Sequence, residues 1–363
     1  MEDYVFKSFD FLHSIPEKGF CEKKTSEFIG NELGKMGMEV ERGVGGTGIV
    51  ARYSSGVAGP AVALRADMDA LEFVIDGRET TRHACGHDAN SSMVLAAAKE
   101  IVERGIKKGT FYTVFQPAEE LGNGALAMIE TGKLEKIDEM FGIHLRPYNE
   151  KPIGRATCGL LHNSSYKIEA VIKGRVSHGA RPHMGVNAAE GAVLAVNSVN
   201  AIKMDPGKSF SAKVTKIETG GNSLNTIPDY VELVFDLRAE DNNLMKELIE
   251  KCRSSISYGA ESIGARVEYQ NISGVPAAEY SDELTDTARK AITKVLGESD
   301  APHMTSGGED FHFYSKVSGI KTAYIGLGAD LKPGLHDPDM SFDKRALIDG
   351  KEILKKVVID RLG

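Results

Sequence analysis

The sequence predicts an α/β protein in which a mostly parallel sheet with flanking helices is interrupted by a second, smaller domain. Two observations support this fold class. Apolar strand-like runs alternate with helical patterns at both ends of the 363-residue chain, as in sheets whose faces are covered by helices. The middle of the chain instead reads strand, helix, strand, strand, helix, strand, the ferredoxin-like pattern of a self-contained domain. A chain of this length also has room for two domains.

The first part of the chain contains strands that end next to polar side chains. Amphipathic helices are expected over residues 6–12 and 22–36, and an Ala-rich helix over residues 91–102. Buried strands are expected over residues 61–65 and 110–115, which are apolar and rich in β-branched or aromatic side chains. Ligand sites of such sheets gather beyond the carboxyl ends of the strands, so the polar residues that follow these runs are candidates for a site.

The smaller domain is expected to span residues 162–274, and the larger one residues 1–161 and 275–363. Apolar periodicity places six elements in the smaller domain, in the order strand, helix, strand, strand, helix, strand: residues 166–173, 187–202, 211–219, 230–238, 242–257 and 265–272. The larger domain then resumes with a helix, a strand and a helix: residues 282–296, 321–326 and 344–362. The smaller domain is therefore expected to be an insertion that splits the larger one.

Composition and charge narrow the class of protein. Hydrophobic residues make up 41% and charged residues 26% of the chain, which is ordinary for a soluble globular protein. A net charge of −8 and the lack of a Lys- or Arg-rich run argue against a nucleic-acid partner. We expect no membrane span, since no apolar stretch approaches about 18 residues. The four cysteines form no C-x-x-C pair and the first residues lack a signal-peptide core, so we expect reduced thiols and a cytoplasmic location.

Four short clusters along the chain carry side chains that bind transition metals: Cys85 with His87, Glu119 with Glu120, His144, and His336. One thiolate, three imidazoles and a carboxylate suit one or two divalent ions of the Zn, Mn, Co or Ni type. Each cluster alone also has an ordinary explanation, namely a buried free thiol beside a helix cap, solvated loop glutamates, or a structural histidine. Together the four clusters favour a metal-dependent hydrolase.

The adjacent glutamates add a chemical argument. They follow an apolar run that ends at Pro117, where two carboxylates are costly to bury unless a cation lies near them. If Glu120 binds a metal ion, Glu119 remains free to take a proton from water and pass it to a leaving amine. The pair is therefore a candidate for both metal binding and proton transfer.

Eight motifs, in order, resemble those of one known family: RADMDAL (65–71), HACGHD (83–88), FQPAEE (115–120), GIHLRP (142–147), SHGARPHMGVNAAEG (177–191), GGNSLNTIPD (220–229), SGGEDFHFY (306–314) and GLHDPDMSF (334–342). The family is that of dinuclear metallopeptidases, which contains aminoacylases, hippurate hydrolases, carboxypeptidases and auxin–amino-acid amidohydrolases. The resemblance covers essentially the whole chain. It implies a catalytic domain interrupted by a lid domain through which two copies form a homodimer.

The resemblance also implies roles for individual residues. Cys85 would bridge two divalent metal ions. The remaining metal ligands would be His87, Glu120, His144 and His336. Glu119 would be the general base, and Asp67 would support the ligands as a neighbouring acidic residue.

The smaller domain contributes three further candidates. By resemblance, His178 would reach across the dimer and help to stabilise the oxyanion, a developing negative charge that needs hydrogen-bond donors. Asn225 and Arg238 would hold the carboxylate or the backbone of the substrate. The alternative explanations are a left-handed turn at Asn225 and a surface ion pair at Arg238.

Two departures from the family pattern lie close to these motifs. Relatives usually have proline after RADMDAL and then a longer loop, whereas here Glu72 follows directly and residues 72–82 make a short segment. Relatives also commonly have histidine where Asn90 stands. Neither change removes an expected ligand, so we expect activity, with a substrate preference that diverges at residues 72–82.

The predicted function is a metal-dependent amidohydrolase that cleaves the amide bond of N-acyl amino acids or similar small amides by metal-activated water. Two alternatives stay open. One is a metallo-carboxypeptidase or dipeptidase, and the other is a metal-containing binding protein without catalytic activity. Retention of Glu119, His178 and the five expected ligands argues against the second alternative.

Overall fold

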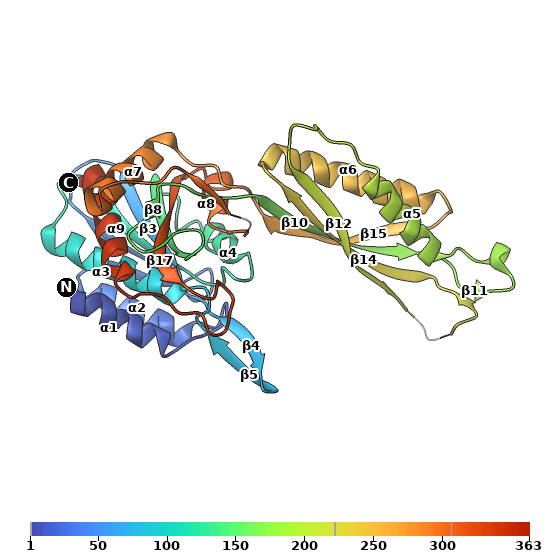
Figure 1. Cartoon of the computed structure of the whole chain (residues 1–363), viewed down its shortest axis with the longest axis horizontal. Helices are drawn as coiled ribbons and strands as arrows, with labels where there is room; N and C mark the ends of the chain where they lie inside the picture. The colour runs from blue at the N-terminus through green and yellow to red at the C-terminus, as the bar shows by residue number, and fades with distance from the viewer. Residues whose placement is uncertain (1, 221–222, 306) are drawn as a thin grey trace. The chain divides into compact units, whose positions relative to one another are not determined.

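The computed structural model describes residues 2–220, 223–305 and 307–363. Residues 221, 222 and 306, which belong to two of the motifs, lie outside the described residues. The described residues form two compact units (Figure 1). Unit 1 contains residues 2–161, 279–305 and 309–363, and unit 2 contains the described residues of 162–278 together with residues 307–308. The larger unit is therefore built from segments on both sides of the smaller one.

Unit 1 is built on a seven-stranded sheet. Across the sheet the order of strands is β1 (Glu39–Val44), β2 (Gly48–Ser54), β6 (Thr110–Gln116), β3 (Ala61–Asp67), β7 (Glu139–Pro147), β17 (Lys321–Leu331) and β8 (Ala156–Thr157). The four strands β6, β3, β7 and β17 are parallel, whereas β1, β2 and β8 pair antiparallel with their neighbours. The expected parallel arrangement is thus found in the centre, but the sheet as a whole is mixed. The antiparallel pairing of β1 with β2 follows from the tight hairpin that joins them.

Helices cover this sheet, and two of them form the main apolar layer. The helices of unit 1 are α1 (Glu2–His13), α2 (Lys23–Lys35), α3 (His87–Arg104), α4 (Gly124–Glu130), α7 (Asp282–Leu296), α8 (His312–Lys316) and α9 (Ala346–Leu362). Helices α3 and α9 pack on each other and on β3 and β7, while α1 packs on α3 and α7 on α9. Gly350 of α9 faces Met93 of α3, and a Cβ at this position would clash with the Met93 side chain unless that side chain moved.

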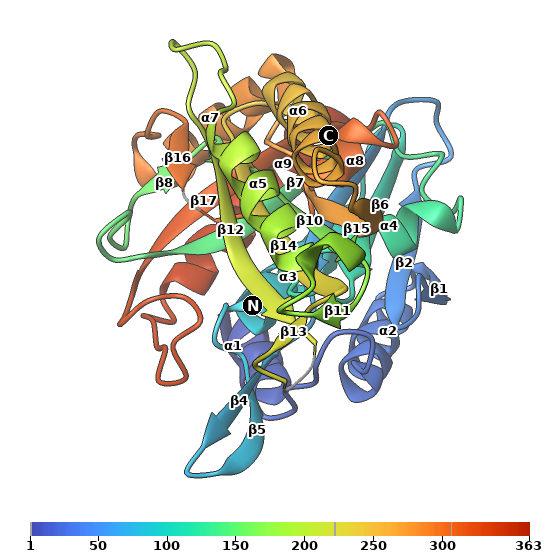
Figure 2. The same ribbon diagram turned by 90° about the vertical axis from the view of Figure 1, so that its right-hand side faces the viewer.

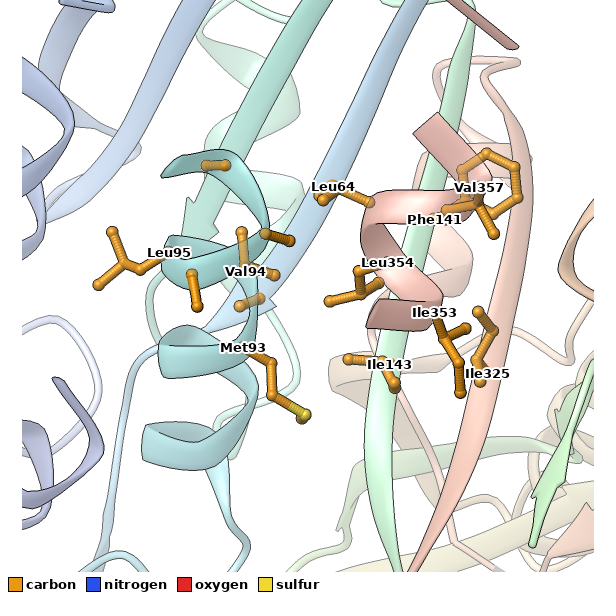
Figure 3. Close-up of a cluster of buried hydrophobic side chains, with 14 of the residues drawn as sticks. Leu64, Met93, Val94, Leu95, Phe141, Ile143, Ile325, Ile353, Leu354 and Val357 are labelled. Carbon is orange, nitrogen blue, oxygen red and sulfur yellow. The ribbon is translucent and has the colours of Figure 1, made fainter. Parts of the chain in front are cut away.

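The core of unit 1 lies between these helices and the sheet (Figure 3). Leu64 from β3, Phe141 and Ile143 from β7, and Leu354 and Val357 from α9 are all 0–1% exposed. Burial of each such side chain contributes roughly 1.5–3 kcal/mol. The central strands β3 and β6 are buried at nearly every position, as expected for parallel strands that are covered on both faces.

The strand register brings the ends of the central strands together. Asp67, the last residue of β3, lies opposite Gln116, the last residue of β6, and His144 lies in β7 opposite Gly326 of β17. Because parallel strands end at the same edge of a sheet, the segments that follow β3 and β6 meet beyond that edge. A hairpin of β4 (Leu71–Ile75) and β5 (Arg78–Arg82) projects from unit 1 next to them (Figures 1 and 2).

Unit 2 has the element order β10-α5-β12-β14-α6-β15. These elements are β10 (Ser164–Lys173), α5 (Ala188–Asn200), β12 (Phe210–Thr219), β14 (Tyr230–Ala239), α6 (Asn242–Glu261) and β15 (Arg266–Val275). The four strands form an antiparallel sheet in the order β12-β14-β10-β15. Helices α5 and α6 lie side by side on it (Figure 2), and buried and half-buried residues alternate along most of β14 as expected for a sheet with one covered face.

The remaining elements are short. They are the 3-10 helix Pro182–Met184 and the strands β9 (Leu160–His162), β11 (Ser177–His178), β13 (Thr226–Ile227) and β16 (His303–Thr305). Strand β11 pairs with β13, and β9 pairs with β16. Within the described part of the chain, the helices are too short or too polar to cross a membrane.

Candidate metal centre

The five candidate ligands of unit 1 come from four separate segments. Cys85 lies in the turn before α3, and His87 is the first residue of that helix. Gly86 between them has φ +89°, a left-handed conformation that glycine adopts without strain and that turns the chain sharply. Glu120 follows β6, His144 lies within β7, and His336 lies in the loop after β17.

These side chains converge into two overlapping clusters. The ligand atoms of Cys85, His87 and His144 lie within 4.8 Å of one another, and so do those of Cys85, Glu120 and His336. Cys85 Sγ is 3.5 Å from His144 Nε2, and Glu120 Oε2 is 3.4 Å from His336 Nε2. Cys85 therefore belongs to both clusters, which is the geometry that a ligand shared by two ions requires.

Two buried polar atoms of the clusters lack hydrogen-bond partners among the described residues, which fits the binding of a cation. His87 Nε2 and Glu120 Oε1 are buried and have no hydrogen-bond partner among the described residues, although they lie only 3.9 Å apart. Leaving a buried polar atom unsatisfied costs about 1–3 kcal/mol, and a bound cation would remove that cost for both. The combination of thiolate, imidazole and carboxylate suits Zn, Mn, Co or Ni. In the absence of a cation, burial raises the pKa of the Cys85 thiol well above its usual value.

Asp69, just beyond the end of β3, orients both His87 and the two glutamates. His87 Nδ1 lies 3.0 Å from the Asp69 carbonyl oxygen and 3.2 Å from its carboxylate, so Nε2 is left facing the clusters. The carboxylate also accepts hydrogen bonds from the backbone N–H groups of Glu119, at 3.1 Å, and Glu120, at 3.0 Å. These groups are presented by a turn in which Ala118 has φ +51°.

Glu119 stands at the edge of the clusters without being needed to complete either of them. Its carboxylate is 3.8 Å from His87 Nε2. It belongs to two further groups whose ligand atoms lie within 4.8 Å of one another, one with His87 and Glu120 and one with Glu309 and Asp310. Burial, and then the negative charge of Glu309, raise the pKa of Glu119 well above its usual value. A carboxyl group with a raised pKa holds a proton more readily, as a general base requires.

Asp67 lies between a buried arginine, Arg65, and the proposed ligand His87. Arg65 Nη1 donates to the Asp67 carboxylate at 2.7 Å, and Asn90 Nδ2 donates to it at 2.8 Å. Asp67 Oδ2 is also 3.7 Å from His87 Nε2. Burial raises the pKa of Asp67, but the positive charges of His87 and Arg65 outweigh it and hold that pKa below its usual range.

The same arginine connects the centre to the start of α8. Arg65 Nη2 donates to Glu309 at 3.2 Å, to Asp310 at 3.1 Å and to the Gln116 side chain at 2.8 Å. Tyr324 Oη donates to Glu309 at 2.7 Å. This buried network holds together segments that are far apart in the sequence.

Sequence reasoning missed the roles of Arg65, Asp69 and Glu309, although each lies within a motif. Arg65 interrupts an otherwise apolar run, and a charged side chain inside a buried strand is a signal for a paired partner. Asp69 is the second acidic residue after that strand. No sequence signal points to Glu309 as the partner of Arg65.

The other three predicted site residues belong to unit 2. His178 is exposed on β11, and its Nδ1 accepts a hydrogen bond from Ala180 N at 3.0 Å. Asn225 adjoins it, because the Asn225 carbonyl accepts from Gly179 N at 2.7 Å. Arg238 on β14 forms a two-pronged ion pair with Asp236 at 2.9 Å. The catalytic role of His178 and the substrate-binding roles of Asn225 and Arg238 stay predictions.

Comparison with known proteins identifies the class to which this geometry belongs. The sequence pattern described as peptidase family M20/M25/M40 matches residues 63–360. The hippurate hydrolase of Campylobacter jejuni is 30% identical and aligns with 97% of this chain and 94% of its own length. The N-acetyl-L-cysteine deacetylase of Bacillus subtilis is 31% identical, over 94% of this chain and 84% of its own length. An IAA-amino acid hydrolase of Arabidopsis thaliana is 32% identical, over 94% of this chain and 76% of its own length.

A solved structure agrees with these relatives. The YXEP protein of Bacillus subtilis, described as a dinuclear metal binding peptidase from the M20 family, superimposes with a TM-score of 0.82. It is 26% identical, and the match covers 99% of this chain and 98% of that one. The protein is thus a metal-dependent amidohydrolase. The chain belongs to peptidase family M20/M25/M40, which confirms the resemblance drawn from the motifs.

Proposed function

We propose that the protein hydrolyses N-acyl amino acids or similar small amides at a centre of two divalent metal ions. The observation that carries this proposal is the pair of overlapping ligand clusters that share Cys85 and lie beside Glu119. The proposed ligands are Cys85, His87, Glu120, His144 and His336. The hydrolases named for hippurate, N-acetyl-L-cysteine and IAA–amino acid conjugates support this substrate class, since each name denotes an acyl group joined to an amino acid.

Each residue near the clusters has a separate task in this proposal. When bound, the two ions would polarise the amide carbonyl and lower the pKa of a water molecule towards neutrality. Glu119 takes the proton of the attacking water and delivers it to the leaving nitrogen. Asp69 fixes the tautomer and the direction of His87, and it holds the backbone of both glutamates. Asp67, kept ionised by Arg65, supports His87 from the other side.

Unit 2 is proposed to be the lid and dimerisation domain. Its ferredoxin-like order of elements is consistent with a self-contained domain, and β12 is a sheet edge with mostly exposed residues. We assign His178 to oxyanion stabilisation and Asn225 and Arg238 to binding of the amino-acid part of the substrate. The exposure of His178 and its proximity to Asn225 support their use in one site.

Replacement of Glu119 by glutamine tests the central assignment. The amide keeps the shape of the side chain but cannot accept the proton, so the kcat for amine release is expected to fall about 10²–10⁴-fold. Bound metal, measured by atomic emission after desalting, is expected to stay the same. Glu130→Gln, at an exposed position at the end of α4, is the matched control and is expected to leave both quantities unchanged. Full turnover by Glu119→Gln with both ions bound would overturn the assignment.

A further inference from the structure

We propose that Arg82 is a positioning residue that holds the loop carrying His336 and thereby sets one of the two metal subsites. The His336 loop comprises residues 332–341. This inference rests on the proposed function, because it takes Cys85, Glu120 and His336 as ligands of one ion. It concerns residues 72–82, the segment in which the sequence predicts a departure from the family pattern.

His336 differs from the other proposed ligands in how it is held. His336 is exposed, whereas Cys85, His87 and His144 are buried. His336 also has φ +65°, a left-handed conformation that costs a residue with a side chain of this size unless its surroundings impose it. The position of its imidazole therefore depends on whatever fixes the backbone of the loop.

Three sets of hydrogen bonds fix that backbone. The neck of the loop is closed by Lys332 N to Ser341 O at 2.9 Å and by the reverse bond at 2.8 Å. His336 N donates to Ala84 O at 2.7 Å. Beyond His336, Arg82 Nη1 donates to Pro338 O at 2.7 Å and lies 3.1 Å from Asp339 Oδ1. Arg82 thus binds the loop at Pro338, two residues beyond the proposed ligand.

Arg82 also leads directly into the turn that carries Cys85. It is the last residue of β5, and its own carbonyl accepts a hydrogen bond from Ala84 N at 2.9 Å. The carbonyl of Ala84, two residues further along this turn, is the acceptor for His336 N. Residues 82–85 therefore connect Cys85 with the loop that carries His336, two members of one ligand cluster. The Arg82 side chain forms the hydrogen bonds between the turn and this loop.

The hairpin gives Arg82 a fixed base. Strand β4 pairs with β5 along its whole length, with Leu71 opposite Arg82. Where β4 begins, Ala70 N donates to Glu17 O at 2.8 Å, and Lys18 Nζ lies 3.0 Å from the Glu72 carboxylate. The base of the hairpin is thus tied to the segment that precedes α2, and Arg82 has a firm position from which to hold the loop.

The cluster of Cys85, His87 and His144 does not include the loop that Arg82 holds. His87 lies in α3 and His144 in β7, and both are buried with the core of unit 1. Loss of the Arg82 side chain is therefore expected to lower the affinity for one of the two ions selectively. A net hydrogen bond of ordinary strength corresponds to an affinity change of about three- to tenfold.

The test compares Arg82→Ala with Arg78→Ala, which removes an exposed arginine at the other end of β5. Metal-free proteins are titrated with Mn²⁺ in a calorimeter. We expect two binding phases in the wild type and in both variants, with one phase weakened about three- to tenfold in Arg82→Ala alone. Arg82→Lys, which restores a donor within reach of Pro338 O, is expected to recover part of the loss. Equal affinities in Arg82→Ala and Arg78→Ala would overturn the proposal.

Hydrogen exchange on the metal-free proteins supplies a second readout that needs neither metal nor activity. The amide of His336 is expected to exchange faster in Arg82→Ala than in the wild type or Arg78→Ala, while the amides of β7 keep their protection. An unchanged exchange rate at the His336 amide would overturn the positioning role of Arg82, even if metal binding changed. A wild-type protein that binds no Mn²⁺ and no Zn²⁺ would instead refute the proposed function, so the two failures are distinguishable.

Discussion

Removal of the buried guanidinium of Arg65 is predicted to destabilise unit 1 severely. The side chain is 1% exposed, and it lies between carboxylates of Asp67, Glu309 and Asp310 that are 0%, 4% and 0% exposed. Arg65→Met keeps an unbranched side chain of similar length but leaves these three acidic groups without their cation. Breaking a buried ion pair from one side costs about 3–5 kcal/mol, because the remaining charge stays desolvated.

The penalty is also predicted to depend on pH. Burial already raises the pKa of Asp310 to about 7, with Arg65 acting in the opposite direction. Without Arg65 the pKa values of the buried carboxyl groups rise further, so the folded variant holds protons that the unfolded chain releases. Stability of the variant therefore falls as pH rises, and the deficit relative to the wild type is expected to be larger at pH 8 than at pH 5.

Native-state hydrogen exchange on metal-free protein measures this effect within unit 1. Peptides that cover β3 and β17 report the free energy of opening of the sheet that contains the network. Arg52→Met is the control, since Arg52 forms an exposed ion pair with Glu39 and is expected to contribute little. An Arg65→Met variant as stable as Arg52→Met would refute the reasoning that the network is held by its central charge.

Two further predictions concern the thiol at the centre and a histidine outside it. Cys85→Ser is expected to reduce the content of both bound ions after desalting, because Cys85 belongs to both clusters. Cys158→Ser, which changes a buried thiol elsewhere in unit 1, is the control and is expected to retain both ions. Selective loss of one ion from Cys85→Ser would exclude a shared ligand. His13 Nδ1 lies 2.6 Å from Asp88 Oδ2, and this hydrogen bond raises the pKa of His13 above its usual 6.5. The stabilisation is fully present below pH 6.5 and is lost as pH rises through the raised pKa, so the wild type is expected to exceed His13→Gln in thermal stability at pH 6 but not at pH 9. A constant difference across that range would count against the ion pair.

The convergence of the candidate ligands could be anticipated because strand ends are readable from sequence. The apolar runs at 61–65 and 110–115 correspond to β3 and β6, and parallel strands share an edge, so the residues that follow them had to meet. The inserted unit was readable for a related reason, since its elements keep regular apolar periodicity. The hairpin of β4 and β5 was not predicted, because β5 is polar and the mostly apolar β4 has only five residues, too few for a clear periodicity.

The support around the ligands could not be derived in this way. Arg65 binds partners at positions 67, 116, 309 and 310, and no local pattern records which distant carboxylate a buried cation will meet. The loop that carries His336 likewise contacts residues 82 and 84, which are far away in the sequence. Motifs identify which residue types are present, whereas their orientation depends on tertiary contacts between motifs.

The most direct test of the account is release of amine from a panel of N-acyl amino acids and dipeptides. Metal-free protein is assayed alone and after reloading separately with Zn, Mn, Co or Ni, and the wild type is compared with Glu119→Gln. We expect release that requires metal, that prefers acyl amino acids over dipeptides, and that Glu119→Gln lacks. Release by the metal-free protein, or silence across the whole panel with two ions bound, would contradict it.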